Sequence, residues 1–253
     1  MTSAPTELPQ RARLALAVQR AVCFALSPLT TLAALVILRF RLRLRFAGTR
    51  ELRRAYRASR RTSNAPLLVC GNHLTMIDSA LIAYALGSPL WYVRHFASLP
   101  WNVPDRNVFA GGLWQRALTY AFKCLPIERG GARTEVADAL ARFTHVLGRG
   151  EVGLIFPEGG RSRTGRVEVA SAAYGVGRIV KSVPGCRVLC VYLRGEAQHA
   201  YSGMPARGDK LRARIAWLEP KTDRRGLRGS LDVSRQILVR LAELEREHFD
   251  AVA

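Results

Sequence analysis

Two short segments of this sequence carry residue types that could do chemistry together. The first, residues 72–78, places an aspartate five positions after His73. A carboxylate at that spacing can fold back onto one ring nitrogen and leave the other nitrogen free to accept a proton. The second, residues 156–162, places Glu158 and Arg161 around two glycines. A guanidinium in a glycine-containing turn is suited to binding an anion.

Together these groups match the needs of one reaction, the transfer of an acyl group onto the hydroxyl of a phosphorylated acceptor. His73 would remove the hydroxyl proton, and Asp78 would fix the tautomer and stabilise the imidazolium. No serine or cysteine lies in a nucleophile motif such as Gly-x-Ser-x-Gly, which favours direct transfer without an acyl-enzyme. A His-x4-Asp spacing alone is weak, and Pro-Glu-Gly-Gly alone is ordinary turn chemistry. Their combination and order favour the functional interpretation.

Both segments follow apolar runs that predict buried strands, at residues 67–70 and 152–156. In α/β proteins, ligand-binding groups lie just beyond the carboxyl ends of parallel strands. We therefore expect the two segments to meet at one edge of a sheet.

These motifs resemble those of the glycerolipid (lysophospholipid) acyltransferase family. The first family signature is Asn-His-x4-Asp and the third is Phe-Pro-Glu-Gly-Thr-Arg-Ser, in which Gly160 here replaces the threonine. The second, an apolar stretch ending in arginine, is matched loosely by residues 125–130. The fourth, an apolar strand usually containing proline, is matched poorly by residues 188–192. The resemblance spans about residues 66–195.

The resemblance implies a catalytic pair and a set of substrate-binding residues, of which Arg129, Glu158, Gly159 and Arg161 hold the phosphate and glycerol portion of the acceptor. The pair is His73 and Asp78, and the set is Asn72, Arg129, Glu158, Gly159, Arg161 and Ser162. It also implies an acyl thioester, acyl-CoA or acyl-carrier protein, as co-substrate, with no cofactor. A metal site is not expected, because nothing supplies a His-x-x-x-His pair or a clustered third ligand.

The default acceptor within the family is a lysophospholipid such as 1-acylglycerol-3-phosphate. Because Gly160 and the missing proline depart from the family pattern, another lipid acceptor such as an ornithine lipid or a glycolipid stays open. A third hypothesis is a non-catalytic basic module that binds membranes or nucleic acid. The intact His73 and Asp78 argue against it.

The composition adds a strong electrostatic constraint. The chain has 253 residues, 49% of them hydrophobic, and a net charge of +20, which attracts anions. Nucleic acid is disfavoured as a partner because zinc-finger spacing, RNA-recognition signatures and basic stretches with interleaved aromatics are absent. Anionic membrane lipids are the expected partner. The five cysteines form no Cys-x-x-Cys pair and are odd in number, which favours buried thiols in a reducing compartment.

The N-terminal region predicts membrane association. Residues 14–38 are strongly apolar, and the uncharged part, residues 21–38, has about the minimum length for a membrane-spanning helix. Because Ser27-Pro28 and Thr30-Thr31 interrupt it, a span, an in-plane helical pair and a buried core helix all stay open. Residues 40–46 alternate arginine with apolar residues, which predicts a strand, and an arginine-rich helix follows over residues 50–61. These arginines suit an anionic cytoplasmic leaflet, so we expect a protein on the cytoplasmic face of the inner membrane.

The remaining sequence alternates strands and helices. We expect strands at residues 66–71, 90–95, 124–128, 151–156, 187–193 and 211–218, and helices at about 77–87, 111–123, 133–149, 171–182 and 231–249. This pattern predicts an α/β fold with a mostly parallel, twisted sheet flanked by helices, similar to glycerol-3-phosphate acyltransferase, preceded by the apolar helical segment. The expected organisation is a tail, membrane-associating helix and first strand in residues 1–46 and an acyltransferase domain in residues 47–253.

Overall fold

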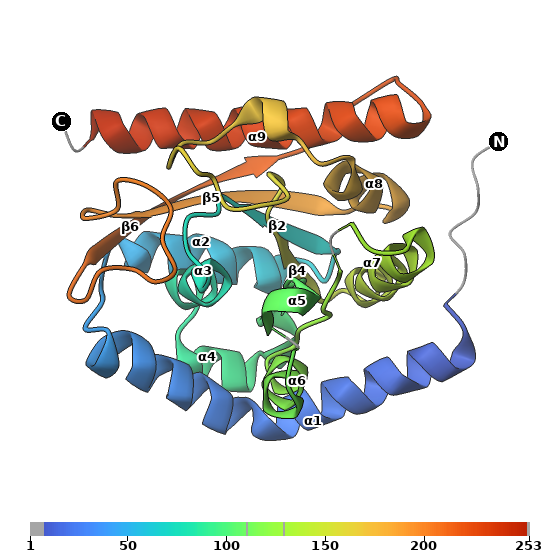
Figure 1. Ribbon diagram of the computed structural model, residues 1–253, viewed down its shortest axis with the longest axis horizontal. Coiled ribbons are helices and arrows are strands. Elements are labelled where there is room, and N and C mark those ends of the chain that lie inside the picture. The colour runs from blue at the N-terminus through green and yellow to red at the C-terminus, as the bar shows by residue number, and fades with distance from the viewer. Residues whose placement is uncertain (1–7, 110, 129, 252–253) are drawn as a thin grey trace.

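A computed structural model describes residues 8–109, 111–128 and 130–251 of the chain (Figure 1). In these residues six strands form one sheet in the order β1-β6-β5-β2-β4-β3. All neighbouring strands are parallel except β5 and β6, which are antiparallel. The strands are β1 (Arg45–Ala47), β2 (Leu67–Gly71), β3 (Trp101–Asn102), β4 (Val152–Ile155), β5 (Arg187–Gly195) and β6 (Lys210–Leu218).

Helices cover both faces of this sheet. They are α1 (Gln10–Val36), α2 (Thr49–Thr62), α3 (Asp78–Leu86), α4 (Pro89–Arg94), α5 (Arg106–Phe109), α6 (Leu113–Ala121), α7 (Arg133–Gly148), α8 (Tyr174–Ser182) and α9 (Gly226–Asp250). A π-helical turn, η1 (Ile37–Arg41), extends α1, and single 3₁₀ turns are η2 (Phe96–Ser98) and η3 (Val169–Ser171). Helices α7, α8 and α9 pack on one face and α2 and α3 on the other, while α1 runs along the outside of α4 and α6 (Figure 1).

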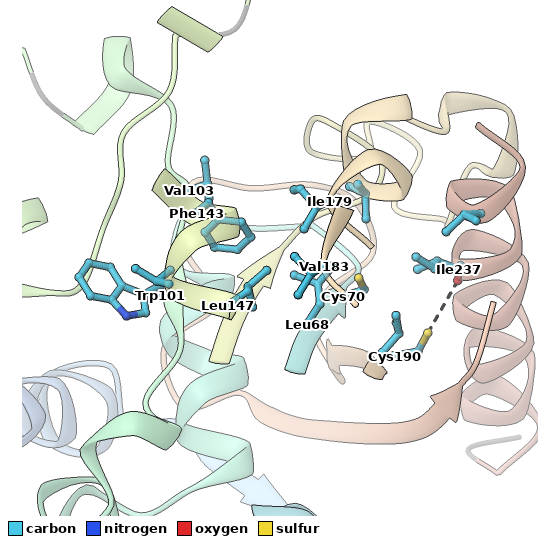
Figure 2. Packing of buried hydrophobic residues seen from close by; sticks show 14 of the residues in the cluster. Leu68, Cys70, Trp101, Val103, Phe143, Leu147, Ile179, Val183, Cys190 and Ile237 are labelled. Atoms are coloured by element: carbon cyan, nitrogen blue, oxygen red, sulfur yellow. Dashed lines mark hydrogen bonds between the residues drawn. The ribbon is translucent and has the colours of Figure 1, made fainter. Parts of the chain in front are cut away.

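The core lies on both sides of the sheet, which explains why the central strands are apolar throughout. Leu68 and Cys70 of β2 point into the layer that contains Phe143 of α7 and Ile237 of α9 (Figure 2). Val69 lies between them in sequence and points to the opposite layer, with α2 and α3. The alternation follows from the two-residue period of a strand. The cysteines are free thiols, three of them buried.

The fold class predicted from the sequence is confirmed, as are most of its strands. The strands expected at 66–71, 151–156, 187–193 and 211–218 correspond to β2, β4, β5 and β6. The strand expected at residues 124–128 is reduced to two isolated bridges, Cys124 with Asn102 and Ile127 with Asp105. Pro126 lies between the two bridges and has no N–H to continue a ladder.

The strand expected at residues 90–95 is wrong, because this segment is the helix α4. Ser88 is its N-cap, with Oγ accepting a hydrogen bond from the backbone N–H of Trp91, and Pro89 occupies the first turn. Both residues favour a helix start. The aromatic and β-branched content of the segment outweighed these signals in the sequence-based prediction. The sheet instead takes its edge strand from β3, which is only two residues long.

The N-terminal region also differs from expectation. Helix α1 continues through Pro28 without ending, so the predicted interruption at Ser27-Pro28 is wrong. Of the expected strand at 40–46, only residues from Arg45 onward are extended, because the helical path persists through η1 and Arg43 then adopts a positive φ of 54°. The domain division expected after residue 46 stays a prediction; residue 46 lies in β1, which pairs with β6.

The expected helices agree with α3, α6, α7, α8 and α9 in position. Helix α9 starts at Gly226, five residues before the predicted start. Helix α2 matches the arginine-rich segment. Strands β2 and β4 are parallel neighbours, with Cys70 beside Ile155. The loops that follow them therefore lie at the same edge of the sheet.

Candidate active site

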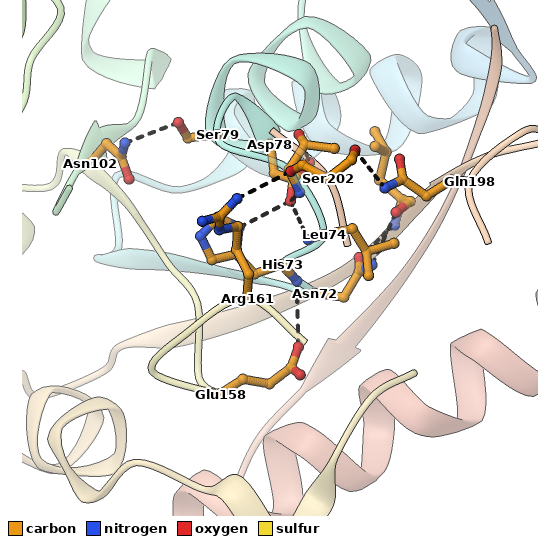
Figure 3. A network of polar contacts seen from close by, with 12 residues as sticks. Asn72, His73, Leu74, Asp78, Ser79, Asn102, Glu158, Arg161, Gln198 and Ser202 are labelled. Atoms are coloured by element: carbon orange, nitrogen blue, oxygen red, sulfur yellow. Dashed lines mark hydrogen bonds and ion pairs between the residues drawn. The ribbon is translucent and has the colours of Figure 1, made fainter. Parts of the chain in front are cut away.

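His73 and Asp78 lie in the loop between β2 and α3. Nδ1 of His73 is 3.0 Å from Oδ2 of Asp78 (Figure 3). The two side chains are only 12% and 4% exposed. With Nδ1 directed at the carboxylate, a neutral ring carries its proton there and presents Nε2 as the basic nitrogen.

The Asp78 carboxylate is held by the turn that precedes it. Oδ2 accepts hydrogen bonds from the backbone N–H groups of Leu74, at 2.5 Å, and Thr75, at 2.7 Å. The Thr75 hydroxyl donates to Oδ1 at 2.5 Å. Asp78 is also the first residue of α3, where the helix dipole favours a negative charge. These donors fix the carboxylate against rotation, so it can orient the imidazole.

Phe156 covers one face of the imidazole. The two rings stack with centroids 4.0 Å apart and an interplanar angle of 11°. Gly71 leaves room for Ile82 in the layer beneath: a Cβ there would lie 2.5 Å from the Ile82 side chain, whereas its 3.4 Å distance to Phe156 would be an ordinary contact. The histidine therefore has one ring edge bound, one ring face covered and little freedom to rotate.

The loop after β4 is joined directly to the histidine turn. The backbone N–H of His73 donates to Oε1 of Glu158 over a long 3.4 Å, and the N–H of Ser162 donates to the His73 carbonyl at 2.9 Å. Gly159 has a φ of +70°, the left-handed region that glycine adopts without strain. Ser162 Oγ donates to the carbonyl of Arg166 at 2.5 Å and so closes the loop on itself.

Glu158 has an unusual electrostatic environment. Its side chain is buried, and burial raises the pKa of the carboxyl from 4.5 to about 7, with the Glu168 and Glu245 carboxylates adding to the rise. Its carboxyl is directed at the backbone of the histidine turn, and Glu158 is not among the residues that line the cleft described below. Its contacts are those of a group that holds two loops together.

The remaining predicted residues differ in their placement. Asn72 uses both ends of its amide on Leu193 of β5, donating to its carbonyl at 3.0 Å and accepting from its N–H at 2.8 Å. Arg161 lies at the surface, donating to the Ser202 carbonyl at 3.2 Å with its guanidinium 5.4 Å from the Tyr201 ring. Arg129 lies outside the described residues.

A cleft of about 730 Å³ opens beside the pair, within the size range of small-molecule sites. His73 and Phe156 line it, as do Arg161, Arg163 and Tyr201. Two arginines give the cleft donors suited to a phosphate or another anion.

A second, narrow cavity of about 130 Å³ adjoins the cleft. Both are lined by Ser79, Ala80, Asn102, Phe122 and Cys124, so they meet at these residues. The cavity continues between α3 and α1 over mainly apolar side chains, among them Ala34 and Tyr84. At the junction Asn102 Nδ2 donates to Ser79 Oγ at 3.0 Å (Figure 3).

Sequence reasoning missed several of these residues. Thr75 had a signal, because Thr-x-x-Asp before an apolar run is a helix-capping pattern. Arg163 lies one residue beyond the third signature. Tyr201, Asn102 and Phe122 join the site only through the tertiary fold and had no local signal. Among the described residues, no group of three or more histidine, cysteine or acidic side chains is arranged to hold a metal.

The α/β sheet carries a carboxylate-bound histidine and an arginine-lined cleft at its carboxyl edge, an arrangement that suits acyl transfer to a hydroxyl. A family model described as Acyltransferase matches residues 43–194, more than half of the chain. The chain therefore belongs to the acyltransferase family, and the match confirms the resemblance to the glycerolipid acyltransferases. The comparison with curated proteins found no match.

Proposed function

We propose that this chain is a membrane-associated O-acyltransferase that moves a fatty acyl group from an acyl thioester to the hydroxyl of a lysophospholipid such as 1-acylglycerol-3-phosphate. One observation carries the proposal: the 3.0 Å contact of Asp78 with His73, which lines a cleft together with two guanidinium groups. A base and anion-binding arginines within one cleft suit a hydroxyl nucleophile on a phosphorylated molecule.

In the proposed reaction Nε2 of His73 takes the proton of the acceptor hydroxyl as its oxygen attacks the thioester carbonyl. The carbon–sulfur bond breaks, the thiolate leaves, and the imidazolium returns the proton to it. Asp78 stabilises the imidazolium while it exists, and its backbone donors keep the carboxylate in place. The proton of the acceptor hydroxyl therefore ends on the released thiol, and His73 returns to its neutral state.

The acceptor is assigned from charge. Arg161 and Arg163 both line the cleft and can give paired hydrogen bonds to phosphate oxygens. Gly160 in place of the family threonine adds no hydroxyl, so the two guanidinium groups carry the recognition. An ornithine lipid or a glycolipid is the alternative acceptor, and it would gain less from two cationic groups.

The apolar cavity supports an acyl-bearing substrate. It begins beside the cleft and runs under α1, so a chain attached at a carbonyl near His73 could extend into it. A net charge of +20 favours both proposed donors, acyl-CoA and acyl-carrier protein, because both are anionic. We place the reaction at the cytoplasmic face of the inner membrane, where thioester donors meet lipid acceptors.

The test is a transfer assay on the full chain in detergent or native membranes. Acyl-CoA and acyl-carrier-protein donors are crossed with a panel of lysophospholipid, lyso-ornithine-lipid and glycolipid acceptors, and products are read by mass spectrometry. His73→Ala should abolish product, whereas His199→Ala, at an exposed histidine that does not line the cleft, should retain it. Equal turnover by wild type and His73→Ala would refute the mechanism. Product from an unphosphorylated acceptor alone would refute the assigned acceptor.

A further inference from the structure

The loop between β5 and β6, residues 196–209, lies outside the residues that the acyltransferase family model matches. Its backbone is irregular, yet it reaches the candidate active site, because Tyr201 lines the same cleft as His73 and Arg161. The family motifs assign nothing to this loop, so its role follows from its contacts alone.

The loop is joined to the histidine turn by backbone hydrogen bonds. The N–H of Met76 donates to the Gly203 carbonyl at 3.1 Å. The N–H of Ser202 donates to the Leu74 carbonyl at 2.9 Å. Because Tyr201 is the chain neighbour of Ser202, these bonds fix its backbone relative to the turn that carries the catalytic pair.

A buried guanidinium fixes the loop from the side of the sheet. Arg194, near the end of β5 and only 6% exposed, donates from Nη2 to the His199 carbonyl at 3.2 Å and from Nη1 to the Gly165 carbonyl at 2.5 Å. A Cβ at Gly165 would lie 2.6 Å from the His199 carbonyl, so the two backbones are in close contact. The loop that carries Arg161 and the loop that carries Tyr201 therefore share one anchor.

These anchors place Tyr201 against Arg161. The Arg161 guanidinium is 5.4 Å from the centre of the Tyr201 ring, and its Nη1 donates to the Ser202 carbonyl at 3.2 Å (Figure 3). A cation at this distance from an aromatic face is attracted by the ring quadrupole. Among the described residues no carboxylate is paired with Arg161, so its other N–H groups can bind an anion.

This arrangement affects affinity because Arg161 is an exposed and flexible side chain. A free arginine loses rotamer freedom when it closes on a ligand, and a contact that orders it beforehand removes part of that loss. A phosphomonoester accepts paired N–H donors from an ordered guanidinium, whereas an uncharged hydroxyl gains much less from them. Holding Arg161 in place therefore favours phosphorylated over unphosphorylated acceptors.

We propose that the loop at residues 196–209 is a specificity element of the acceptor site, in which Tyr201 is a positioning residue that holds the Arg161 guanidinium for a phosphomonoester group. The inference rests on the proposed function, since it names the residue that orders the phosphate-binding arginine of that site. The phosphate is that of the acceptor. The phosphates of coenzyme A are the other source of the same chemistry, and measurements on each substrate separate the two.

The first test measures binding without turnover, by isothermal titration of glycerol 3-phosphate into the full chain in detergent. Tyr201→Leu should weaken binding about threefold, because the attraction between an exposed cation and a ring is modest, whereas Tyr201→Phe keeps the ring and should bind like wild type. Met204→Ala is the matched control, since Met204 lies in the same loop, is 45% exposed against 47% for Tyr201, and is not among the residues that line the cleft. Circular dichroism verifies that the variants are folded.

Three results of this titration would overturn the proposal. They are equal binding by wild type and Tyr201→Leu, no binding by wild type, and an equal loss in Tyr201→Phe and Tyr201→Leu. The last result would assign the effect to the phenol hydroxyl and not to the ring.

A double-mutant cycle tests whether Tyr201 acts through Arg161. Arg161→Gln should itself weaken binding, while Arg163 remains in the cleft to bind the probe. Adding Tyr201→Leu to Arg161→Gln should then have no further effect, as expected when two residues act through one contact. A full threefold effect in that background would mean that the ring contacts the ligand directly, and it would overturn the positioning role.

The second test is the transfer assay with each substrate varied in turn. Tyr201→Leu should raise the KM for 1-acylglycerol-3-phosphate about threefold and leave kcat and the KM for acyl-CoA unchanged. The ratio of kcat/KM for 1-acylglycerol-3-phosphate to that for 1-acylglycerol should fall by the same factor. A rise in the KM for acyl-CoA alone would assign Arg161 to the phosphates of coenzyme A and would overturn the proposal. Because the titration does not read turnover, a wild type that binds glycerol 3-phosphate but forms no product would count against the proposed function and not against this inference.

Discussion

Replacing Glu158 with glutamine should make the protein more stable at neutral and alkaline pH. The pKa of the Glu158 carboxyl is raised from 4.5 to about 7, mainly by burial. The folded chain therefore holds this proton more tightly than the unfolded chain does. Glutamine keeps an oxygen that can accept from the His73 N–H but carries no charge.

The sign follows from linkage. Below pH 4.5 the carboxyl is protonated in both states and adds no pH dependence. Between pH 4.5 and 7 the unfolded chain releases the proton first, so the free energy of unfolding of the wild type falls as pH rises. Above pH 7 the loss is complete. At about 1.4 kcal/mol per pKa unit, the rise of the pKa from 4.5 to about 7 amounts to at most about 3.5 kcal/mol.

The assay is urea unfolding of wild type and Glu158→Gln in the same detergent from pH 4 to pH 8. The difference in the free energy of unfolding should grow by about 3 kcal/mol in favour of the variant over this range. Glu219→Gln, at an exposed acid, is the control and should run parallel to wild type. The reasoning would be refuted if the difference in the free energy of unfolding did not depend on pH. It would also be refuted if the wild type became more stable relative to the variant above pH 7. The second outcome would mean that a nearby cation stabilises the ionised carboxylate.

Three further changes test other parts of the structure. Thr75→Val removes the hydroxyl that donates to Asp78 at 2.5 Å, so kcat should fall about tenfold. Thr75→Ser keeps a hydroxyl and should restore kcat. An unchanged kcat in Thr75→Val would exclude a positioning role for Thr75. Ala34→Phe narrows the apolar cavity and should shift the preferred donor to shorter acyl chains, unlike Ala25→Phe on the exposed face of α1, as competition assays would show. Gly177→Ala places a Cβ 1.9 Å from a carbonyl of α9 and should destabilise the protein by about 1–3 kcal/mol in thermal unfolding. Gly175→Ala in the same helix meets nothing within 4 Å and should change stability by less than about 1 kcal/mol, so equal effects would contradict the packing argument.

The errors in the sequence-based prediction have local causes. Residues 90–95 have the aromatic and β-branched composition of a strand, but the Ser88 cap and Pro89 start a helix there. Residues 40–46 alternate like a strand, but the helical path of α1 persists into them through η1. Composition describes which side chains suit a pleated surface, and it does not record where the backbone hydrogen bonds of the preceding helix end.

The sequence by itself determined the central strands and the two segments that follow them. Apolar runs such as residues 67–70 must be buried on both faces, and a parallel strand buried in this way presents its next residues at the sheet edge. It also determined the spacing of His73 and Asp78, because five positions are enough for a turn to close on itself. These features depend on neighbours in sequence, which is why they could be predicted.

Only the tertiary structure decided what surrounds that pair. It stacks Phe156 on His73, brings Tyr201 and Arg163 to the cleft, and joins the cleft to a cavity under α1. It also turned an apolar segment long enough to span a membrane into a helix bound along one face by Gln19 and its neighbours. Each of these outcomes depends on contacts between residues that are distant in sequence, and no local pattern encodes which of the possible long-range partners the folded chain will bring together.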